Sequence, residues 1–486
     1  TEWAARNNYA VEVDYQGSVD IARMLQTGSM QYDAVWPANT LWLAFGDTQG
    51  LVEHEESIMR SPVVFGLKRP VAEQLGWLDQ DVTMSDILDA AERGDVRFMM
   101  TSATQSNSGA SFYFAALSAF AGSPEVISQA DLEDPAVQDQ IKRILGTVDR
   151  SSGSSGWLKD LFLETYDLFD GMVNYESVLI EANQELATMG RAPLVAIYPI
   201  DGSAIADSPL GFINTSSDEK ETIFLELRDF LLGDEAQAQL VAAGRRAGNL
   251  GLQLDNVDTS VFRPDWNIDV NQVIQPIRFP NTQVIGEALN LYQTSFRRPS
   301  CTVIAVDRSG SMHGNGERNA NAGLRTILNQ GTAEQFLIQA TPNDVTTVML
   351  FNERVINRSE LDRWTVRGND ADALNNLYVQ AESVNSGGGT NIFGTAFQAL
   401  TWLDQVRTPE CLPSVILMTD GEDNENQQAT LNTYLDNNEN DIPIFVITFG
   451  GAREDQVGPM VDRTFGRIFD GRSNLIGAFR SAKGYN

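Results

Sequence analysis

A short apolar run that ends on an aspartate constrains this chain more than any other feature. Residues 302–306 are rich in β-branched side chains, as in a strand buried on both faces, and Asp307 follows directly. Ser309 and Ser311 come next, on either side of Gly310, which lets the backbone turn tightly. A carboxylate and two hydroxyls in a loop after a strand form an oxygen-rich corner that suits Mg²⁺, Mn²⁺ or Ca²⁺ rather than zinc.

Two later segments extend this oxygen-rich corner. Residues 387–389 are a glycine-rich turn that presents the Thr390 hydroxyl, and the apolar run 415–419 is followed by Asp420. The five candidate metal ligands are Asp307, Ser309, Ser311, Thr390 and Asp420. The alternative is that the two serines only cap the next helix and that Asp420 only starts a turn.

These five positions, in this order and on these elements, resemble the metal-ion-dependent adhesion site of von Willebrand factor A domains. The resemblance covers residues 299 to about 485, and we assign the domain to 299–486. It implies a doubly wound, Rossmann-like α/β domain with a mostly parallel six-stranded sheet. It also implies one bound divalent cation, Mg²⁺ or else Mn²⁺ or Ca²⁺, with an open position for an acidic residue of a protein partner.

Strand and helix patterns also alternate through the N-terminal part of the chain. Expected strands lie at 9–15, 33–36, 58–68, 96–101, 193–199 and 209–214. Their order, with stretches such as "YDAVWP", "SPVVFGL" and "PLVAIYP", resembles the type 2 solute-binding proteins of ABC importers, in the molybdate and sulfate branch. The resemblance implies a two-lobed domain over 1–270 whose first lobe lacks its opening strand and is truncated or completed from elsewhere.

The candidate solute site of this domain follows from helix starts, where free backbone N–H groups suit an anion. Tyrosine hydroxyls add donors. The candidate residues are Ser18, Ser106, Asn107, Ser108, Tyr175 and Tyr198. The alternative is that the residues at helix starts are N-caps and nothing more. Glu176 would repel an anion; it pairs with an amine or a metal, or is a first-turn residue favoured by the helix dipole.

Three segments between the main patterns have their own assignments. Residues 255–276 show no periodicity and carry two prolines, so they predict an interdomain linker, and 271–298 add a lead-in helix. Residues 151–156 are rich in Ser and Gly and predict a surface loop. A long helix is expected over 319–339. Glu422 and Asp423 favour a solvated acidic rim over additional metal ligands.

Composition excludes several classes of function. The net charge of −32 argues against nucleic acid, whose binding needs phosphate-neutralising Lys and Arg. Two histidines and two cysteines exclude a Cys/His metal cluster. No apolar stretch is long enough to span a bilayer, so we expect membrane attachment only through an anchor or signal removed before Thr1. No catalytic constellation is present, and we expect no enzyme activity.

The A-domain resemblance also concerns the two cysteines, Cys301 and Cys411. In A domains the strands that carry the two aspartates are neighbours, which implies that both cysteines lie at the sheet end opposite the metal. Neighbouring strands are close enough for a disulfide. A disulfide would place the chain in an oxidising compartment. The alternative is two buried, reduced thiols.

Together these features predict an extracellular or cell-surface bacterial protein that binds a protein partner through its metal. The fused solute-binding-like module would take a small anion or another solute. One alternative is an intracellular accessory subunit like the A domains of magnesium and cobalt chelatases, which work with an ATPase. Another is a transport receptor in which the A domain is only a scaffold.

Overall fold

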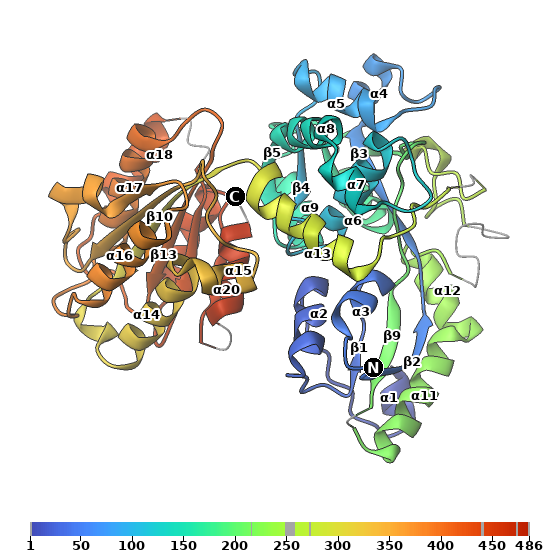
Figure 1. The fold of residues 1–486 in the computed structure, drawn as a ribbon, viewed down its shortest axis with the longest axis horizontal. Helices are drawn as coiled ribbons and strands as arrows, with labels where there is room; N and C mark the ends of the chain where they lie inside the picture. The colour runs from blue at the N-terminus through green and yellow to red at the C-terminus, as the bar shows by residue number, and fades with distance from the viewer. Residues whose placement is uncertain are drawn as a thin grey trace. The chain divides into compact units, whose positions relative to one another are not determined.

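The computed structural model describes residues 2–214, 216–247, 258–271, 274–438, 442–472 and 475–484. The chain divides into two compact units, Thr1–Leu289 and Asn290–Asn486, which Figure 1 colours blue to yellow and yellow to red. The division falls inside helix α13 (Thr282–Leu291), so the domain limits at 270 and 299 stay predictions. Residues 255–257 and 272–273 of the predicted linker lie outside the described residues.

The first unit has two lobes, each built on its own sheet. The sheet of the first lobe has three antiparallel strands in the order β1-β9-β2. Its strands are β1 (Ala34–Val35), β2 (Val52–Ser57) and β9 (Pro209–Ile213). The helices of this part of the unit are α1 (Glu2–Arg6), α2 (Ser18–Thr27), α3 (Thr40–Gly46), α11 (Asp218–Leu232) and α12 (Asp234–Ala242).

The second lobe is centred on a mixed sheet in the order β5-β4-β6-β3-β7, with β8 paired to β3. Its strands are β3 (Ser61–Lys68), β4 (Phe98–Thr101), β5 (Val148–Ser152), β6 (Gly171–Tyr175), β7 (Leu194–Ile197) and β8 (Ile205–Ala206). Its helices are α4 (Arg69–Leu75), α5 (Met84–Glu92), α6 (Asn107–Phe120), α7 (Gln129–Glu133), α8 (Pro135–Gly146), α9 (Ser155–Glu164) and α10 (Glu176–Thr188).

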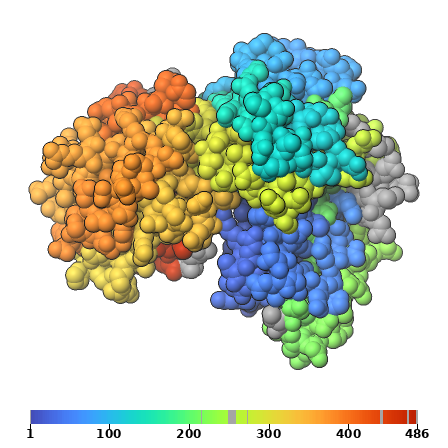
Figure 2. Space-filling model, in the orientation of Figure 1, coloured from blue at the N-terminus to red at the C-terminus, as the bar shows by residue number. Residues whose placement is uncertain are grey.

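Helix α13 touches both lobes of the first unit. A Cβ placed at Gly286 would lie 3.6 Å from the Phe45 ring of α3. The Tyr113 hydroxyl of α6 donates a hydrogen bond to the Ala288 carbonyl at 2.8 Å. Figure 2 shows this yellow-green chain between the blue N-terminal segment and the cyan segment of the second lobe. The lead-in helix is therefore part of the first unit's packing.

The second unit has one six-stranded sheet in the order β12-β11-β10-β13-β14-β15. All neighbouring pairs are parallel except the edge strand β12, which confirms the predicted doubly wound fold. Its strands are β10 (Ser300–Asp307), β11 (Val345–Phe351), β12 (Thr365–Arg367), β13 (Leu412–Thr419), β14 (Ile444–Thr448) and β15 (Ile468–Asp470). Every residue of β10, β11 and β14 is buried, as expected for strands covered on both faces.

Helices cover the sheet of the second unit, as Figure 1 shows for α14, α16 and α17. They are α14 (Asn315–Leu328), α15 (Gln330–Gln335), α16 (Ala371–Glu382), α17 (Ile392–Val406), α18 (Gln428–Asn437), α19 (Glu454–Arg463) and α20 (Leu475–Gly484). Short 3-10 and π segments occur at Pro264–Trp266, Tyr292–Phe296, Gly310–Met312 and Arg358–Trp364. No helix among the described residues combines the length and apolar character that a membrane crossing requires.

Three predictions of secondary structure are wrong. Residues 9–15 form no strand, because their alternating apolar side chains Val11, Val13 and Tyr15 are exposed and have no sheet to pack on. Residues 151–152 belong to β5 rather than a loop, because they pair with β4. The expected helix at 319–339 is broken at Asn329, whose side chain accepts from the Thr332 N–H and caps α15.

Candidate functional site

Two neighbouring strands of the second unit end at the same edge of the sheet, and each delivers an aspartate there. β10 and β13 are parallel and in register, with Val306 opposite Met418. Asp307 is the last residue of β10, and Asp420 follows β13 directly. Loops at the carboxyl ends of parallel strands are where open α/β sheets place their ligands.

The candidate metal ligands meet at this edge. The hydroxyls of Ser309 and Ser311 are 3.0 Å apart, and Ser311 donates to Asp420 Oδ1 at 2.8 Å. A Cβ placed at Gly421 would lie 3.0 Å from Ser311 Oγ and 3.3 Å from Thr390 Oγ1. Gly421 therefore leaves the space that lets the threonine loop approach the serines.

Asp307 is buried at the base of this group. Its Oδ1 accepts from the Ser309 N–H at 2.7 Å, and its Oδ2 accepts from the Thr419 hydroxyl at 2.6 Å. Burial raises the pKa of Asp307 to about 6, against the hydrogen bonds from Thr419 and Ser309, and the negative charge of Asp420 raises it further. Burial also raises the pKa of Asp420. A raised pKa means that the charged form of each carboxylate is disfavoured. A cation between the two would stabilise their charged forms and lower both pKa values.

The donor set fits a hard divalent cation. Two carboxylates and three hydroxyls offer only oxygen, which Mg²⁺, Mn²⁺ and Ca²⁺ prefer. Asp307 is fully buried, whereas Ser311 is exposed, so the group of oxygens faces solvent on one side. Of the described residues, those that would hold the cation are Ser309, Ser311 and Thr390, with Asp307 and Asp420 beside them.

Backbone hydrogen bonds join the glycine-rich turn at 387–389 to the loop that follows Asp307. The Gly310 N–H donates to the Gly388 carbonyl at 3.0 Å, and the Gly387 N–H donates to the Arg308 carbonyl at 2.8 Å. Gly388 has φ +88°, a conformation that other residues rarely adopt. The glycines thus allow the Thr390 loop to lie along the Ser309 loop.

A second set of contacts joins the Thr390 loop to the loop after Asp420. Asp423 Oδ1 accepts from the Ile392 N–H at 2.7 Å, at the start of α17. Asn424 Oδ1 accepts from the Thr390 N–H at 3.0 Å, and the Asn424 N–H donates to the Thr390 carbonyl at 3.0 Å. The predicted acidic rim is therefore wrong for Asp423, which is half-buried and accepts a hydrogen bond from the first turn of α17, while Glu422 is exposed.

We expect Asp423→Ala to weaken Mg²⁺ binding about tenfold, because the loop that carries Thr390 would lose its anchor. Loss of the hydrogen bond from the Ile392 N–H should also lower the free energy of unfolding by about 1 kcal/mol. Calorimetric titration with Mg²⁺ and chemical denaturation measure the two effects. Glu422→Gln is the matched control and should change neither; an Asp423→Ala affinity equal to that of the wild type would show that the anchor is dispensable.

We expect Mg²⁺ affinity to fall as the pH is lowered through about 6. Since the pKa of Asp307 is raised to about 6 in the metal-free chain, protonated Asp307 predominates below that pH, and the proton competes with the cation. Affinity should be nearly constant above about pH 7. Titrations across this range check the expectation, and equal affinities on both sides of pH 6 would contradict it.

Cys301 and Cys411 form a disulfide at the other end of these strands, with Cα atoms 5.7 Å apart. Cys301 is the second residue of β10, and Cys411 directly precedes β13. Both are buried. The bond therefore ties together the strands that deliver the two aspartates.

In the first unit, four of the six candidate solute-binding residues come together. Ser106 and Ser108, at the start of α6, lie 3.1 and 2.8 Å from the hydroxyl of Ser155, where α9 begins. The Asn107 amide donates to the Tyr175 hydroxyl at 3.1 Å, next to the start of α10. Burial raises the pKa of Tyr175 to about 12. The starts of three helices thus surround one polar cluster, buried at Ser106, Asn107 and Ser108 and half-buried at Ser155 and Tyr175.

Ser18 and Tyr198 have other partners. The Ser18 hydroxyl accepts from the Ala38 N–H at 3.1 Å. The Tyr198 hydroxyl donates to Glu176, and burial together with the negative charge of Glu176 holds the pKa of Tyr198 well above its usual value. Neither of the two is linked by a hydrogen bond in the described structure to the four residues of the polar cluster.

Glu176 has a partner that sequence reasoning missed. The Arg246 guanidinium donates to both of its carboxylate oxygens, at 2.8 and 2.6 Å, and both side chains are fully buried. Glu176 does lie in the first turn of α10, as one predicted alternative has it, but its partner is a guanidinium of the same chain and neither an amine nor a metal. The sequence contains Arg245 and Arg246 side by side, but nothing in it indicates a contact across 70 positions.

We expect Arg246→Ala to lower the free energy of unfolding of the first unit by about 3 kcal/mol, because it leaves the Glu176 charge buried and unpaired. Arg245→Ala is the matched control. Arg245 pairs with Glu181 near the surface, so its loss should cost under about 1 kcal/mol. Chemical denaturation compares the two variants, and similar losses would contradict the assignment.

The first unit also contains a cavity of about 460 Å³. Its lining comes from Asn39 and α3, from Arg60, from residues 205–207 and from residues 276–285, rather than from the six predicted positions. Asp207 is the acidic group in this lining, and it accepts from the Thr40 N–H and hydroxyl at 2.8 and 2.6 Å. Arg60 is the basic group in this lining, and the apolar residues include Phe279 and Ile285.

Comparison with known families assigns the first unit. The family described as bacterial extracellular solute-binding protein matches residues 1–246 of the 486. The chain belongs to this family. The expectation of an extracellular binding protein is thereby supported at the level of the family.

Similar solved structures include members of two classes. An extracellular solute-binding protein from Bordetella parapertussis is 11% identical, with a TM-score of 0.41 over 60% of this chain and 91% of that chain. Maltose-bound MalE3 from T. maritima is 12% identical, with a TM-score of 0.44 over 60% and 88%. A von Willebrand factor type A protein from Catenulispora acidiphila is 20% identical, with a TM-score of 0.32 over 39% and 43%. No curated protein matches the sequence. With TM-scores below 0.5, these similarities carry no argument about this chain.

Proposed function

We propose that the chain is a secreted or cell-surface bacterial binding protein whose second unit is a von Willebrand factor A domain. In this proposal the domain engages an acidic residue of a protein partner through a metal-ion-dependent adhesion site. The observation that carries it is the meeting of the five candidate ligands at one sheet edge, Asp307, Ser309, Ser311, Thr390 and Asp420.

The residues of the site have two roles in this proposal. Some supply negative charge to the cation, and others leave it accessible to a carboxylate of the partner. Asp307 supplies negative charge from the buried side of the site. The Ser309 N–H and the Thr419 hydroxyl orient its carboxylate. The hydroxyls of Ser309, which is buried, and of Ser311, which is exposed, supply neutral donors. A bound divalent cation would act as a Lewis acid toward a carboxylate of the partner. The hydroxyl ligands favour this, because they add no negative charge and leave the cation a net attraction for an incoming anion.

The test uses peptides displayed on phage, selected against the immobilised full chain in Mg²⁺. We expect the selected peptides to contain an essential Asp or Glu and to dissociate in EDTA. They should bind again when Mn²⁺ is added, and they should fail to bind the Asp420→Ala variant. Peptides held equally with and without the chelator would show that the metal face is not the contact surface.

The disulfide favours this proposal over the chelatase-type alternative. Chelatase A domains work inside the cell, where thiols are kept reduced. The Cys301–Cys411 bond and the extracellular solute-binding family both support an oxidising location. Fractionation of the source cells tests the point, and recovery of the chain from the cytoplasm would favour the chelatase-type role.

A second proposed function, uptake of a small solute by the first unit, rests on the family match over residues 1–246. The polar cluster at the starts of α6, α9 and α10 favours an anion. Thermal unfolding in the presence of sulfate, molybdate or a neutral sugar tests this. Stabilisation by an oxyanion that disappears in Asn107→Ala would support it, while stabilisation by the sugar alone would move the ligand site to the apolar cavity.

A further inference from the structure

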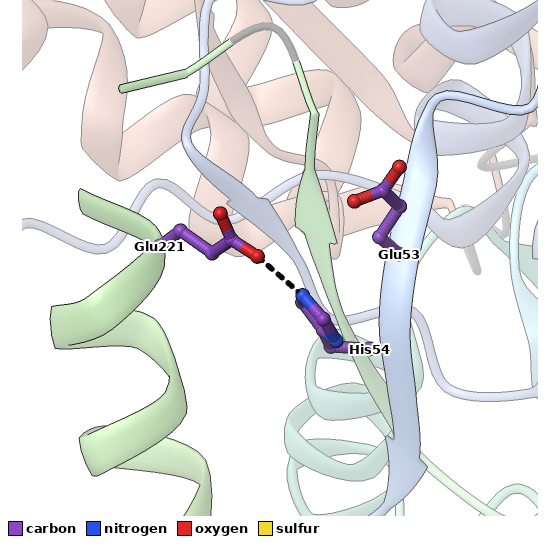
Figure 3. A group of neighbouring side chains, drawn as sticks. All are labelled: Glu53, His54 and Glu221. Atoms are coloured by element: carbon purple, nitrogen blue, oxygen red, sulfur yellow. Dashed lines mark hydrogen bonds and ion pairs between the residues drawn. The ribbon is translucent and has the colours of Figure 1, made fainter. Parts of the chain in front are cut away.

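A group of metal-ligating side chains lies in the first lobe, away from both sites described above. Glu53 and His54 are on strand β2, and Glu221 is in the first turns of α11 (Figure 3). One ligand atom from each lies within 4.8 Å of the others, and His54 Nε2 is 2.6 Å from Glu221 Oε1. We propose that these three residues bind a zinc-type divalent transition metal.

A β-bulge explains how two adjacent strand residues can face one ion. Successive side chains in a regular strand point to opposite faces of the sheet. In β2 the register with β9 shifts between Glu53 and Glu56, and His54 has φ +55°. This local turn leaves the His54 imidazole and the Glu53 carboxylate close enough to share an ion. In Figure 3 His54 lies between the two glutamates, and the dashed line joins it to Glu221.

Two of the three side chains also have neighbours in or directly beside the sheet, and the third is on a capped helix. The His54 ring lies 6.4 Å from the Phe212 ring of β9, between centroids. The Asn214 amide donates to Glu53 Oε1 at 3.4 Å. Glu221 is carried by α11, whose start is capped by the Ser217 side chain. A cation here would join the edge strand of the three-stranded sheet to the helix that covers it.

The ligand chemistry selects a different metal from the one proposed for the second unit. Zinc accepts a ligand set of one imidazole nitrogen and two carboxylates. A water molecule then takes the fourth position. Mg²⁺ and Ca²⁺ prefer oxygen ligands alone, as in the Asp307 group. The side chains of His54 and Glu221 are 34% and 35% exposed, so an ion can reach them from solvent. The net charge of −32 adds a general attraction for cations.

The test is calorimetric titration of the full chain with Zn²⁺ in an excess of Mg²⁺, which occupies the oxygen-only site. We expect one Zn²⁺ per chain in the wild type and none at this site in His54→Ala. Glu53→Gln and Glu221→Gln should each weaken binding at least about tenfold. Zn²⁺ should raise the unfolding temperature of the wild type and not that of His54→Ala.

His313→Ala is the matched control, because His313 is the other histidine and also has a glutamate nearby, Glu317 at 3.9 Å. This variant should bind Zn²⁺ like the wild type. Circular dichroism verifies that the glutamine variants, which keep side-chain size, are folded. The proposal is overturned if the wild type takes up no Zn²⁺ stoichiometrically, or if His54→Ala binds Zn²⁺ as the wild type does.

Discussion

Asp307→Ala is expected to abolish Mg²⁺ and Mn²⁺ binding by the second unit while leaving that unit folded. Asp307 is the fully buried carboxylate of the group, and its charge has no basic partner among the hydrogen bonds described for it, which come from the Ser309 N–H and the Thr419 hydroxyl. Removing it takes away half of the negative charge that would hold the cation. We expect at least a hundredfold loss of affinity, about 3 kcal/mol.

The same change should cost little stability in the absence of metal. Burial and the charge of Asp420 already disfavour the ionised form of Asp307, as its raised pKa shows. Alanine removes that unfavourable charge and loses two hydrogen bonds, so the net change should stay within about 1–2 kcal/mol. Titration with Mn²⁺ and denaturation in EDTA measure the two quantities.

The control for Asp307→Ala is Asp436→Ala, which removes an exposed aspartate of α18 paired with Arg463. It should leave Mg²⁺ and Mn²⁺ affinity unchanged. An Asp307→Ala variant that binds either metal as tightly as the control would refute the assignment of the site. An Asp307→Ala variant that fails to fold would contradict the expected small change in the free energy of unfolding. In that case the metal affinity is measured on Asp307→Asn, which retains the shape of the side chain.

Removal of the Cys301–Cys411 disulfide is expected to be the most destabilising change in the second unit. The bond spans 110 residues. In the chain-entropy model, opening a loop of that length releases conformational freedom in the unfolded chain and costs about 4–5 kcal/mol. For a unit of this size the midpoint of thermal unfolding should fall by on the order of 10 °C.

The measurement compares the wild type with Cys301→Ala/Cys411→Ala, each with and without reductant. Reductant should destabilise the wild type and leave the double variant unchanged, because the variant has no bond to lose. Thiol counting on denatured, unreduced protein gives an independent answer. Two free thiols there would contradict the disulfide and would also withdraw its support for an oxidising location.

Most of the second unit's fold could be predicted because its signals are local. The strands at 302–306 and 415–419 are continuous apolar runs, and each candidate metal ligand lies within a few residues of a strand end or a glycine turn. Parallel strands bring their carboxyl ends to one edge, so naming the strands also places the loops. The register of β10 with β13 then sets Asp307 near Asp420.

The first unit was predicted less well because its decisive contacts lie far apart in the sequence. Val11, Val13 and Tyr15 alternate as in a strand, but alternation needs a sheet to bury one face, and here all three are exposed. Residues 151–152 have weak strand character, and they are extended because β4 lies beside them. The pattern of residues within a short segment does not indicate whether another strand lies beside it.

The sequence by itself determined the alternating α/β order, the oxygen-only ligand set and the strand ends that carry it. These follow from side-chain chemistry and from periodicity over a few residues. Only the tertiary structure decided which buried acid pairs with a base, which acid accepts a hydrogen bond from the start of a helix, and which histidine lies beside two glutamates. Glu176 with Arg246, Asp423 with α17, and His54 with Glu221 are each formed by chain segments at least 30 residues apart. Such contacts depend on how elements pack, and packing is a property of the whole core.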